Sequence, residues 1–285
     1  MNNTAQTDKV WFITGCSTGF GREIALAALD KGYRAVVTAR RLDSMDDIVQ
    51  QYPDTALAIS LDITNQQQID SAINQALDHF KQIDILVNNA GYGYVAAIEE
   101  GEEQAVRDLF ETNFFGPLAL SKAVIPHMRE RQSGRIINNS SQAGLMANPG
   151  TGYYSASKYA LEGLMEALAK ELEPFNIQVT SVQPGAFRTD WAGRSMQRTH
   201  TPMPEYQASV GARLDMIAQM DGKQPGDPKR GAEVFLMLAE CDNPPLQLLL
   251  GAGVLAAYKE KLNTIEQSLE EWESTTLSAD YPPTE

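Results

Sequence analysis

The sequence predicts an α/β fold built on one doubly wound parallel sheet with helices on both faces. Short apolar runs alternate with longer helical patterns from residue 10 onward, which is the rhythm of parallel strands joined by helical crossovers. The runs are rich in Val, Ile and Leu, as expected for strands that are buried on both faces. The chain has 285 residues, and an α/β fold can reach about 250 residues as a single unit.

About seven strands and five helical stretches follow from this alternation. Each expected strand is a short apolar run, and each expected helix is long enough for a right-handed crossover between parallel strands. The strands are expected at residues 10–14, 34–39, 56–61, 83–88, 135–139, 177–182 and 246–250, and the helices near 20–31, 66–79, 103–131, 154–173 and 229–240.

One segment, residues 190–228, breaks the alternation. It contains four prolines and four methionines, Met196, Met203, Met216 and Met220. An ordinary surface insertion is one interpretation, but loops of this length in compact domains are more often lids or binding loops, and methionine suits an adaptable apolar pocket. We therefore expect one domain over 1–285, with a core at 8–251, a substrate lid near 190–228 and an acidic C-terminal extension at 262–285. A short helix near 262–272 is expected to dock on the body, with the last residues frayed.

The composition excludes several classes of protein. The net charge is −14, from 37 acidic and 23 basic residues, which argues against nucleic acid as a partner. Six of the acids lie in 262–285, where there is no Lys or Arg. Two cysteines without a C-x-x-C motif and three scattered histidines predict neither a disulfide framework nor a metal site. With no apolar leader and no apolar run near the roughly 18 residues of a membrane span, a cytoplasmic protein is expected.

A glycine-rich turn, Gly15 to Gly21, follows the first strand and leads into a helix. Glycines allow a sharp turn and close approach of the backbone to a pyrophosphate, while the helix N-terminus offers free N–H groups. Ordinary tight-turn chemistry is the alternative. The second strand ends in Ala39 with Arg40 and Arg41 after it, where an acidic residue would bind the ribose of NADH. Two guanidinium groups favour NADPH, unless both are merely solvated loop charges.

Tyr154 and Lys158 stand four residues apart, so on a helix they project from one face. This short pattern is weak alone, but other polar or turn residues follow the strands of the same sheet. They are the tetrad Asn88 to Gly91, the tetrad Asn138 to Ser141, and Pro184-Gly185. The carboxyl ends of strands are where open α/β sheets bind ligands.

With these motifs the chain resembles the classical short-chain dehydrogenase/reductase family, well over residues 8–190 and more loosely over 228–251. The resemblance implies a Rossmann-type fold and a nicotinamide cofactor. The opening Thr14-Gly15-Cys16-Ser17 and the strand end at Ala39 to Arg41 are most similar to reductases related to 17β-hydroxysteroid and retinol dehydrogenases.

The family resemblance also implies four catalytic residues. Tyr154 is expected to protonate the developing alkoxide during carbonyl reduction, and Lys158 to stabilise the phenolate and hold the nicotinamide ribose. Ser141 would polarise the carbonyl oxygen, and it rather than Ser140 lies the usual thirteen residues before Tyr154. Asn113 would position a water in a proton relay that reaches Lys158.

The same resemblance implies the cofactor contacts, several of them through the backbone. Tyr154 and Lys158 belong to this set as well. The others are Gly15, Ser17, Thr18, Gly19, Phe20 and Gly21 at the pyrophosphate and ribose, Arg40 at the 2'-phosphate, Asp62 and Ile63 at the adenine, Asn89, Ala90 and Gly91 at the adenosine side, and Pro184, Gly185, Phe187 and Thr189 at the nicotinamide carboxamide.

The predicted function is an NADP(H)-dependent oxidoreductase that interconverts a ketone or aldehyde and an alcohol. NAD(H)-dependent alcohol oxidation is the alternative within the family, and a non-catalytic NADPH sensor is an alternative from another class. An apolar small-molecule substrate is expected from Trp191 and the methionines of the insertion. Family members commonly form homodimers or homotetramers through the helices near 103–131 and 154–173. Cys16 is expected to pack rather than react, and His200 to be solvated.

Overall fold

The computed structural model describes residues 8–191, 193, 195–200 and 202–281. The expectation of no apolar leader concerns residues 1–7, which lie outside the described part of the chain. Glu285 of the acidic extension lies outside it as well. Seven parallel strands form one sheet in the order β3-β2-β1-β4-β6-β7-β9. Their bounds fall within two residues of the predicted ones: β1 Val10–Thr14, β2 Arg34–Ala39, β3 Ala56–Ser60, β4 Ile85–Asn88, β6 Gly134–Asn139, β7 Ile177–Pro184 and β9 Gln247–Leu250.

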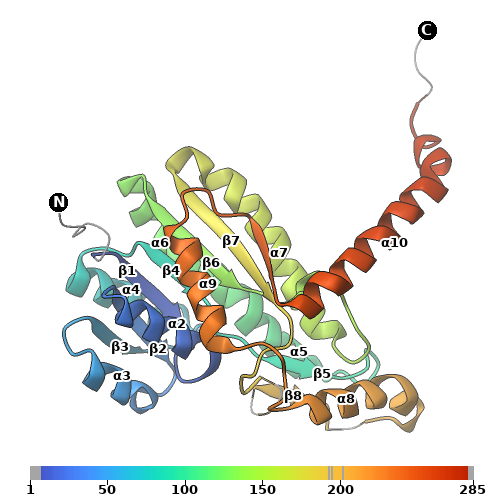
Figure 1. The fold of residues 1–285 in the computed structure, drawn as a ribbon, viewed down its shortest axis with the longest axis horizontal. Helices are drawn as coiled ribbons and strands as arrows, with labels where there is room; N and C mark the ends of the chain where they lie inside the picture. Colours follow the sequence, from blue (N-terminus) through green and yellow to red (C-terminus); the bar gives the residue numbers. More distant parts are fainter. Residues whose placement is uncertain (1–7, 192, 194, 201, 282–285) are drawn as a thin grey trace.

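Helices cover both faces of the sheet, as predicted (Figure 1). Trp11 and Ile13 of β1 pack toward one layer of helices, and their neighbours Val10 and Phe12 pack toward the other, because side chains alternate along a strand. Burying one such side chain fully contributes about 1.5–3 kcal/mol. The first layer holds α2 Gly19–Asp30, α3 Asp46–Gln51 and α9 Pro228–Glu240, and the second holds α4 Gln66–Phe80, α6 Gly116–Arg131 and α7 Gly152–Leu172.

The strand order reverses beside β1. The chain builds β1, β2 and β3 outward to one side and then crosses over to place β4 on the other side of β1. At such a switch point the connections leave the carboxyl ends of two neighbouring strands in opposite directions, which opens a crevice for a ligand. The glycine-rich turn after β1 and the tetrad after β4 are therefore neighbours in space.

The insertion at 190–228 has more structure than the sequence predicts. Met196–Arg198 forms β8, which pairs parallel with β5, Gly93–Val95, and Ala212–Met220 forms α8. Strands of three residues are too short for a periodic signal, so neither was predicted. Three glutamates before α5, Glu103–Phe110, anchor the insertion: Glu99 accepts from Tyr206 Oη (2.5 Å), Glu100 from Met203 N (2.6 Å) and Glu102 from His200 N (2.9 Å). Residues 192, 194 and 201 of the insertion lie outside the described residues.

The C-terminal prediction was wrong in length and placement. Instead of a short helix at 262–272 docked on the body, α10 runs over 26 residues, Ala252–Leu277, and points away from the sheet (Figure 1). Only its base packs: Val254 is buried, and Lys261 Nζ donates to Tyr159 Oη (2.7 Å). Leu262 and Trp272 stay 45% and 56% exposed because the straight helix carries them away from the body. No described helix has the length and apolar character needed to cross a bilayer.

Candidate active site

Polar groups at the carboxyl ends of β1, β4 and β6 are joined across the sheet. Asn89 Nδ2 donates to the backbone oxygen of Thr14 (2.7 Å), and Asn139 Nδ2 donates to Asn89 Oδ1 (2.9 Å). Lys158 Nζ, from α7, then donates to the backbone oxygen of Asn139 (3.0 Å). Thr14 Oγ1 adds two bonds, from the backbone N–H groups of Asn89 (2.9 Å) and Ala90 (3.0 Å). We call this chain of contacts the amide ladder; it locks the lysine to the two strands that flank the crevice.

The glycine-rich turn forms one wall of the crevice. Gly15 and Gly19 have φ of 74° and 60°, a region that glycine enters without strain. A Cβ on Gly21 would lie 2.3 Å from Asn89 Nδ2, so the turn can lie against the ladder only with glycine there. Thr18 is the extended N-cap of α2, and Ser17 is partly exposed beside it. The N-terminal amides of α2 and the turn thus form a cradle that fits a pyrophosphate.

The opposite wall comes from the segment after β7. Pro184 is buried at the end of the strand, and Gly185 N donates to the backbone oxygen of Leu250 (3.0 Å). A Cβ on Gly19 would lie 3.5 Å from the Cβ of Thr189, so this segment lies directly opposite the phosphate turn. The phosphate turn and the segment after β7, which were both singled out from the sequence, are therefore neighbours and are in contact at Gly19 and Thr189.

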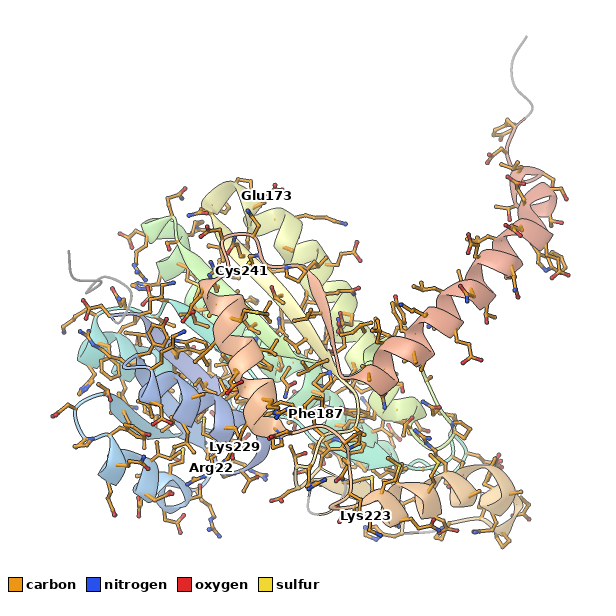
Figure 2. All side chains as sticks on the ribbon, in the orientation of Figure 1. Arg22, Glu173, Phe187, Lys223, Lys229 and Cys241 are labelled. Atoms are coloured by element: carbon orange, nitrogen blue, oxygen red, sulfur yellow. The ribbon has the colours of Figure 1, made fainter. Side chains whose placement is uncertain are left out.

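Two predicted cofactor contacts, Phe20 and Ile63, have core side chains, and a third, Phe187, packs against the core. The Phe20 and Phe187 rings pack with centroids 4.9 Å apart, and Phe235 of α9 packs on Phe20 at 6.1 Å. Figure 2 shows Phe187 in the connection that leaves β7. Ile63 is 7% exposed and packs in the cluster under α6. The side chains of Phe20 and Ile63 are buried, so these two residues can meet a cofactor only through their backbone, and the partly buried Phe187 packs against the same core as Phe20.

The charges after β2 differ in how they are compensated. Arg41 pairs with Asp43 (3.3 Å), whereas Arg40 is exposed and forms no ion pair with a described residue. Burial raises the pKa of Tyr92, which follows the β4 tetrad, to about 12, and the charge of Arg40 opposes this rise. The charge of Arg40 therefore acts on the loop that follows β4. Asp62 uses Oδ1 to accept from Thr64 N (3.0 Å) and Thr64 Oγ1 (2.8 Å), which shapes the turn after β3.

Tyr154 and Lys158 lie on one face of α7, as predicted. Lys158 Nζ is 5.9 Å from the centroid of the Tyr154 ring, and both residues are buried. Burial raises the pKa of Tyr154 to about 12, while hydrogen bonding with Ser141 and Trp191 opposes the rise. Burial also lowers the pKa of Lys158 to about 8, while the charge of Glu162 opposes that fall. At neutral pH the phenol is therefore neutral and the ammonium is mostly charged.

Ser141 reaches the same place from the end of β6. Its Oγ accepts from Ala143 N (3.1 Å) as the cap of a short turn at Gln142–Gly144, which aims the hydroxyl toward Tyr154. Its neighbour Ser140 is 5% exposed, and its hydroxyl has no hydrogen-bond partner among the described residues. The two serines thus have different surroundings, and Ser141 is the one that meets the tyrosine.

Asn113 occupies a π-helical turn, Glu111–Phe115, between α5 and α6. Its side chain is fully buried: Nδ2 donates to Tyr92 O (2.9 Å) and Ser157 Oγ (3.2 Å), and Oδ1 accepts from Tyr92 N (3.1 Å). The side chain therefore joins the loop after β4 to α7. Such π turns alter the backbone hydrogen-bond pattern and are frequent at functional sites.

An aromatic side chain from the start of the insertion packs against Tyr154. The Trp191 ring lies over Tyr154 with centroids 5.4 Å apart, and a Cβ on Gly93 would lie 2.9 Å from the indole. Met196 is 7% exposed and packs as part of β8, whereas Met216 and Met220 are exposed on α8. The methionines of the insertion are thus divided between packing and the surface, and Trp191 is the apolar group that meets the tyrosine.

Cys16 and Tyr94 pack in the interior of the protein, and His200 lies at its surface. Cys16 is fully buried, and burial raises its pKa to about 12, which fits packing and not nucleophilic chemistry. Tyr94 is 1% exposed, and its hydroxyl accepts from Glu102 N (3.0 Å), so it braces the loop below the insertion. His200 is exposed. Among the described residues no three His, Cys, Asp or Glu side chains converge as metal ligands would.

Glu162 is a site residue that the sequence reasoning missed. It lies one turn beyond Lys158 on α7 and is 7% exposed. Its Oε2 accepts from Gln183 Nε2 of β7 (3.0 Å) and Gln247 Nε2 of β9 (3.1 Å), while Oε1 has no partner among the described residues. The same four-residue step that joins Tyr154 to Lys158 leads on to Glu162, so extending the period by one turn would have found it.

Comparison with known proteins shows that this chain is similar to oxidoreductases. A family model described as short chain dehydrogenase matches residues 9–199. The chain is 35% identical to "Oxidoreductase BOA17" of Botryotinia fuckeliana over 95% of its length and 99% of the relative. It is 33% identical to a 3-ketodihydrosphingosine reductase of Bacteroides thetaiotaomicron, over 92% and 94% of the two chains.

Solved structures of short-chain dehydrogenases and oxidoreductases also superpose on this chain. A short-chain dehydrogenase from Streptomyces avermitilis superposes with a TM-score of 0.90 at 42% identity, covering 96% of this chain and 99% of that one. A metagenomic short-chain oxidoreductase in complex with NADP superposes with a TM-score of 0.69 at 26% identity, covering 85% and 96%.

Proposed function

This chain belongs to the short-chain dehydrogenase family and is an NAD(P) oxidoreductase of CH–OH and C=O groups, and on that premise we propose that it reduces a ketone or aldehyde with NADPH. The observation that carries the proposal is the convergence of Tyr154, Lys158 and Ser141 beside the phosphate cradle, with Lys158 locked to the amide ladder. These groups lie where a carbonyl and a nicotinamide ring would meet.

In this mechanism the protein supplies a proton and the bound cofactor supplies a hydride. The Ser141 hydroxyl donates a hydrogen bond to the carbonyl oxygen and polarises it. As negative charge develops there, Tyr154 transfers its phenolic proton to the oxygen and the alcohol forms. The ammonium of Lys158 stabilises the phenolate that is left, which brings the Tyr154 proton within reach near neutral pH.

The phenolate is then reprotonated from the Lys158 side. Lys158 lies against the backbone oxygen of Asn139, and the π turn at Asn113 is joined to α7 through Ser157. A water bound at the backbone of that turn would connect Lys158 to solvent. In this arrangement the Asn113 side chain holds the turn in place, and the turn positions the water of the proton relay expected from the family.

Arg40 supports the preference for NADPH. It follows β2, where the adenosine ribose would lie, and unlike Arg41 it has no carboxylate partner among the described residues. A guanidinium forms charge-assisted hydrogen bonds with a phosphate, and these strengthen binding of the phosphorylated cofactor. NAD-dependent alcohol oxidation stays the alternative, and it predicts similar affinity for both cofactors.

The substrate is proposed to be apolar, and residues 190–228 are proposed to act as its lid. The packing of Trp191 over Tyr154 supports an apolar group next to the reacting carbon. The Bacteroides relative is named as a reductase of 3-ketodihydrosphingosine, and that name agrees with such a substrate class. The narrower similarity to 17β-hydroxysteroid and retinol dehydrogenases stays a prediction.

Assembly and location are proposed from the same family membership. The exposed faces of α5 and α6, over 103–131, and of α7 are proposed to form a homodimer or homotetramer interface. Both cysteines are free thiols, and Cys241 is exposed, which suits the reducing cytoplasm.

The decisive test compares the wild type with Tyr154→Phe. Loss of NADPH absorbance is followed with a panel of ketones and aldehydes that includes long-chain and steroid ketones. The variant should lose at least about 10²-fold in kcat, the lower end of what a positioned acid contributes, and its fluorescence titration with NADPH should match the wild type. Full turnover in the variant would refute the role of Tyr154. NADPH binding without oxidation by the wild type on any carbonyl would favour the sensor.

A further inference from the structure

The outer part of α10 carries an unpaired apolar stripe. Figure 2 shows the side chains of this helix with no other element beside them beyond its base. Leu255, Leu262, Ile265, Leu269 and Trp272 are each at least 42% exposed. A row of exposed apolar side chains on a solvated helix is unusual, because amphipathic helices normally gain most of their stability by packing an apolar face.

The spacing of the stripe is that of a coiled-coil seam. With the half-buried Tyr258, the apolar positions follow steps of three, four, three, four and three residues: Leu255, Tyr258, Leu262, Ile265, Leu269 and Trp272. At 3.6 residues per turn these side chains fall on an arc of about 100°. The regular alternation of three- and four-residue steps is the a/d repeat of a coiled coil, so this face matches another helix with the same repeat.

The charges along the helix select the direction of pairing. The base, Ala252 to Lys261, has one more basic than acidic residue, from Lys259, Glu260 and Lys261. Residues 262–277 have four glutamates and no Lys or Arg. Two such helices side by side in the same direction would bring eight carboxylates together, whereas opposite directions place the acidic outer part of each beside the basic base of the other.

We propose that α10 is a dimerisation arm that pairs, in antiparallel orientation, with α10 of a second copy of this chain. The two-fold axis passes between Leu262 and Ile265, so Leu262 of one arm packs on Ile265 of the other and Leu255 packs on Trp272. Lys259 of each arm then lies beside Glu266 of the other. Because the same patch is used by both copies, the contact closes on itself and makes a pair and not a fibre.

The anchor of the arm fits this role. Lys261 donates to the Tyr159 hydroxyl (2.7 Å) and to the backbone oxygen of Leu145, and its ammonium lies 5.3 Å from the Tyr159 ring centroid. Val254 is 1% exposed at the start of the helix. These contacts fix the direction of the arm relative to α7 and leave the seam beyond them uncovered. The surface is separate from the active site, so the proposal stands apart from the proposed function.

The first experiment measures mass by sedimentation equilibrium on the full chain. The seam variant is Ile265→Glu with Leu269→Glu, and the matched control is Asn263→Glu with Gln267→Glu, which adds the same charge to the opposite face. We expect the seam variant to fall to half the wild-type mass at equal concentration and the control to keep it. Equal masses for all three proteins, or loss in both variants, would overturn the proposal.

A charge exchange tests the partner and its direction. Lys259→Glu alone and Glu266→Lys alone should each weaken self-association by about three- to tenfold, as two symmetric exposed ion pairs would. The double variant should restore the wild-type dissociation constant, because the antiparallel contacts are re-formed with reversed signs. A double variant as weak as the two single changes combined would contradict this pairing.

Spin labels at position 275 give the orientation directly. In a Cys241→Ser background, Thr275→Cys labels should lie about 35 Å apart in the antiparallel pair, from 1.5 Å of rise per residue. A separation under about 20 Å would indicate parallel arms, since paired helix axes lie about 8–10 Å apart, and would refute the orientation. Absence of any intermolecular distance, with the arm seated on the partner's body or on nothing, would refute the pairing itself.

Discussion

The reacting groups and the proposed substrate lid are held in place in different ways. Lys158 is tied to the strands through the amide ladder, whose members Asn89 and Asn139 stand at the ends of β4 and β6. The insertion at 190–228 is joined to the body by a three-residue strand pair, by three glutamates of the loop before α5, and by backbone hydrogen bonds of Gly226 with Ala186 and Arg188. The reacting groups are thus held by the main sheet, whereas the proposed lid is held by short contacts with loops outside that sheet.

Removing the lysine should have the largest effect in this comparison. Lys158→Met keeps much of the side-chain volume and deletes the charge beside Tyr154, so we expect kcat to fall about 10³-fold. Burial lowers the pKa of Lys158 below that of a lysine in the unfolded chain, so the charged ammonium destabilises the folded state. The variant lacks this charge and should therefore melt no lower than the wild type. The measurements are steady-state turnover and thermal unfolding at pH 7. Unchanged kcat would show that the proton transfer does not need this charge.

Removing Arg40 should affect one cofactor and leave the chemistry intact. Arg40→Ala is expected to raise the KM for NADPH about 10- to 100-fold, the worth of one or two charge-assisted hydrogen bonds. The KM for NADH and the kcat should change little. Arg41→Ala is the matched control, since Arg41 already pairs with Asp43. Equal loss with both cofactors, or equal loss in both variants, would contradict the assignment of Arg40 to the 2'-phosphate.

Loosening the lid should act on substrate binding alone. Glu100 is 7% exposed and accepts from Ala97 N (2.8 Å) and Met203 N (2.6 Å), one bond for each carboxylate oxygen. Glu100→Gln replaces one carboxylate oxygen, which accepts a hydrogen bond, by an amide NH₂ group, which donates one. A buried donor then lacks its partner, which costs about 1–3 kcal/mol. We expect part of this cost to appear as a rise of about three- to tenfold in the KM for the carbonyl.

A control and a second readout separate this effect from general destabilisation. Glu99→Gln affects only the exposed bond to Tyr206 and should leave the KM near the wild-type value. Limited proteolysis should cut Glu100→Gln sooner within 190–228. A fall in kcat without a change in KM would show that the insertion takes part in the chemistry and is more than a lid.

The smallest expected effect is a shift of the pH profile by Glu162→Gln. Burial lowers the pKa of Lys158 to about 8, and the Glu162 charge holds it from falling further. The ammonium exists below its pKa, so kcat/KM for reduction should decline above about pH 8 in the wild type and at lower pH in the variant. The amide can keep the contacts with Gln183 and Gln247 after reorientation, so a merely structural role would leave the profile in place.

The repeating features of the fold were predictable because they depend on local periodicity. Each strand of the main sheet is an apolar run, and each was found within two residues of its predicted bounds. The two strands that were not predicted are too short to give a periodic signal. The strands β5 and β8 have three residues each, and they exist because Gly93–Val95 and Met196–Arg198 meet across about one hundred residues of chain.

The C-terminal helix shows a different limit. Its seam was visible as scattered Leu and Trp in an acidic tail, but the sequence does not say whether an apolar face packs on its own body or on another chain. The direction of α10 depends on how β9 ends and on contacts of Lys261 with Tyr159, a residue of another helix. For this reason the expectation of a docked helix at 262–272 was wrong.

Sequence alone determined the order of strands and helices, the glycines of the phosphate turn, and the four-residue step that places Tyr154 and Lys158 on one helix face, because each of these follows from residues close together in the chain. Tertiary structure alone decided that Asn139 and Asn89 bridge Lys158 to β1, that Phe20 and Ile63 turn into the core, and that Glu162 stands behind the lysine. Those facts depend on which distant segments pack together, and local periodicity carries no information about the partner on the other side of a contact.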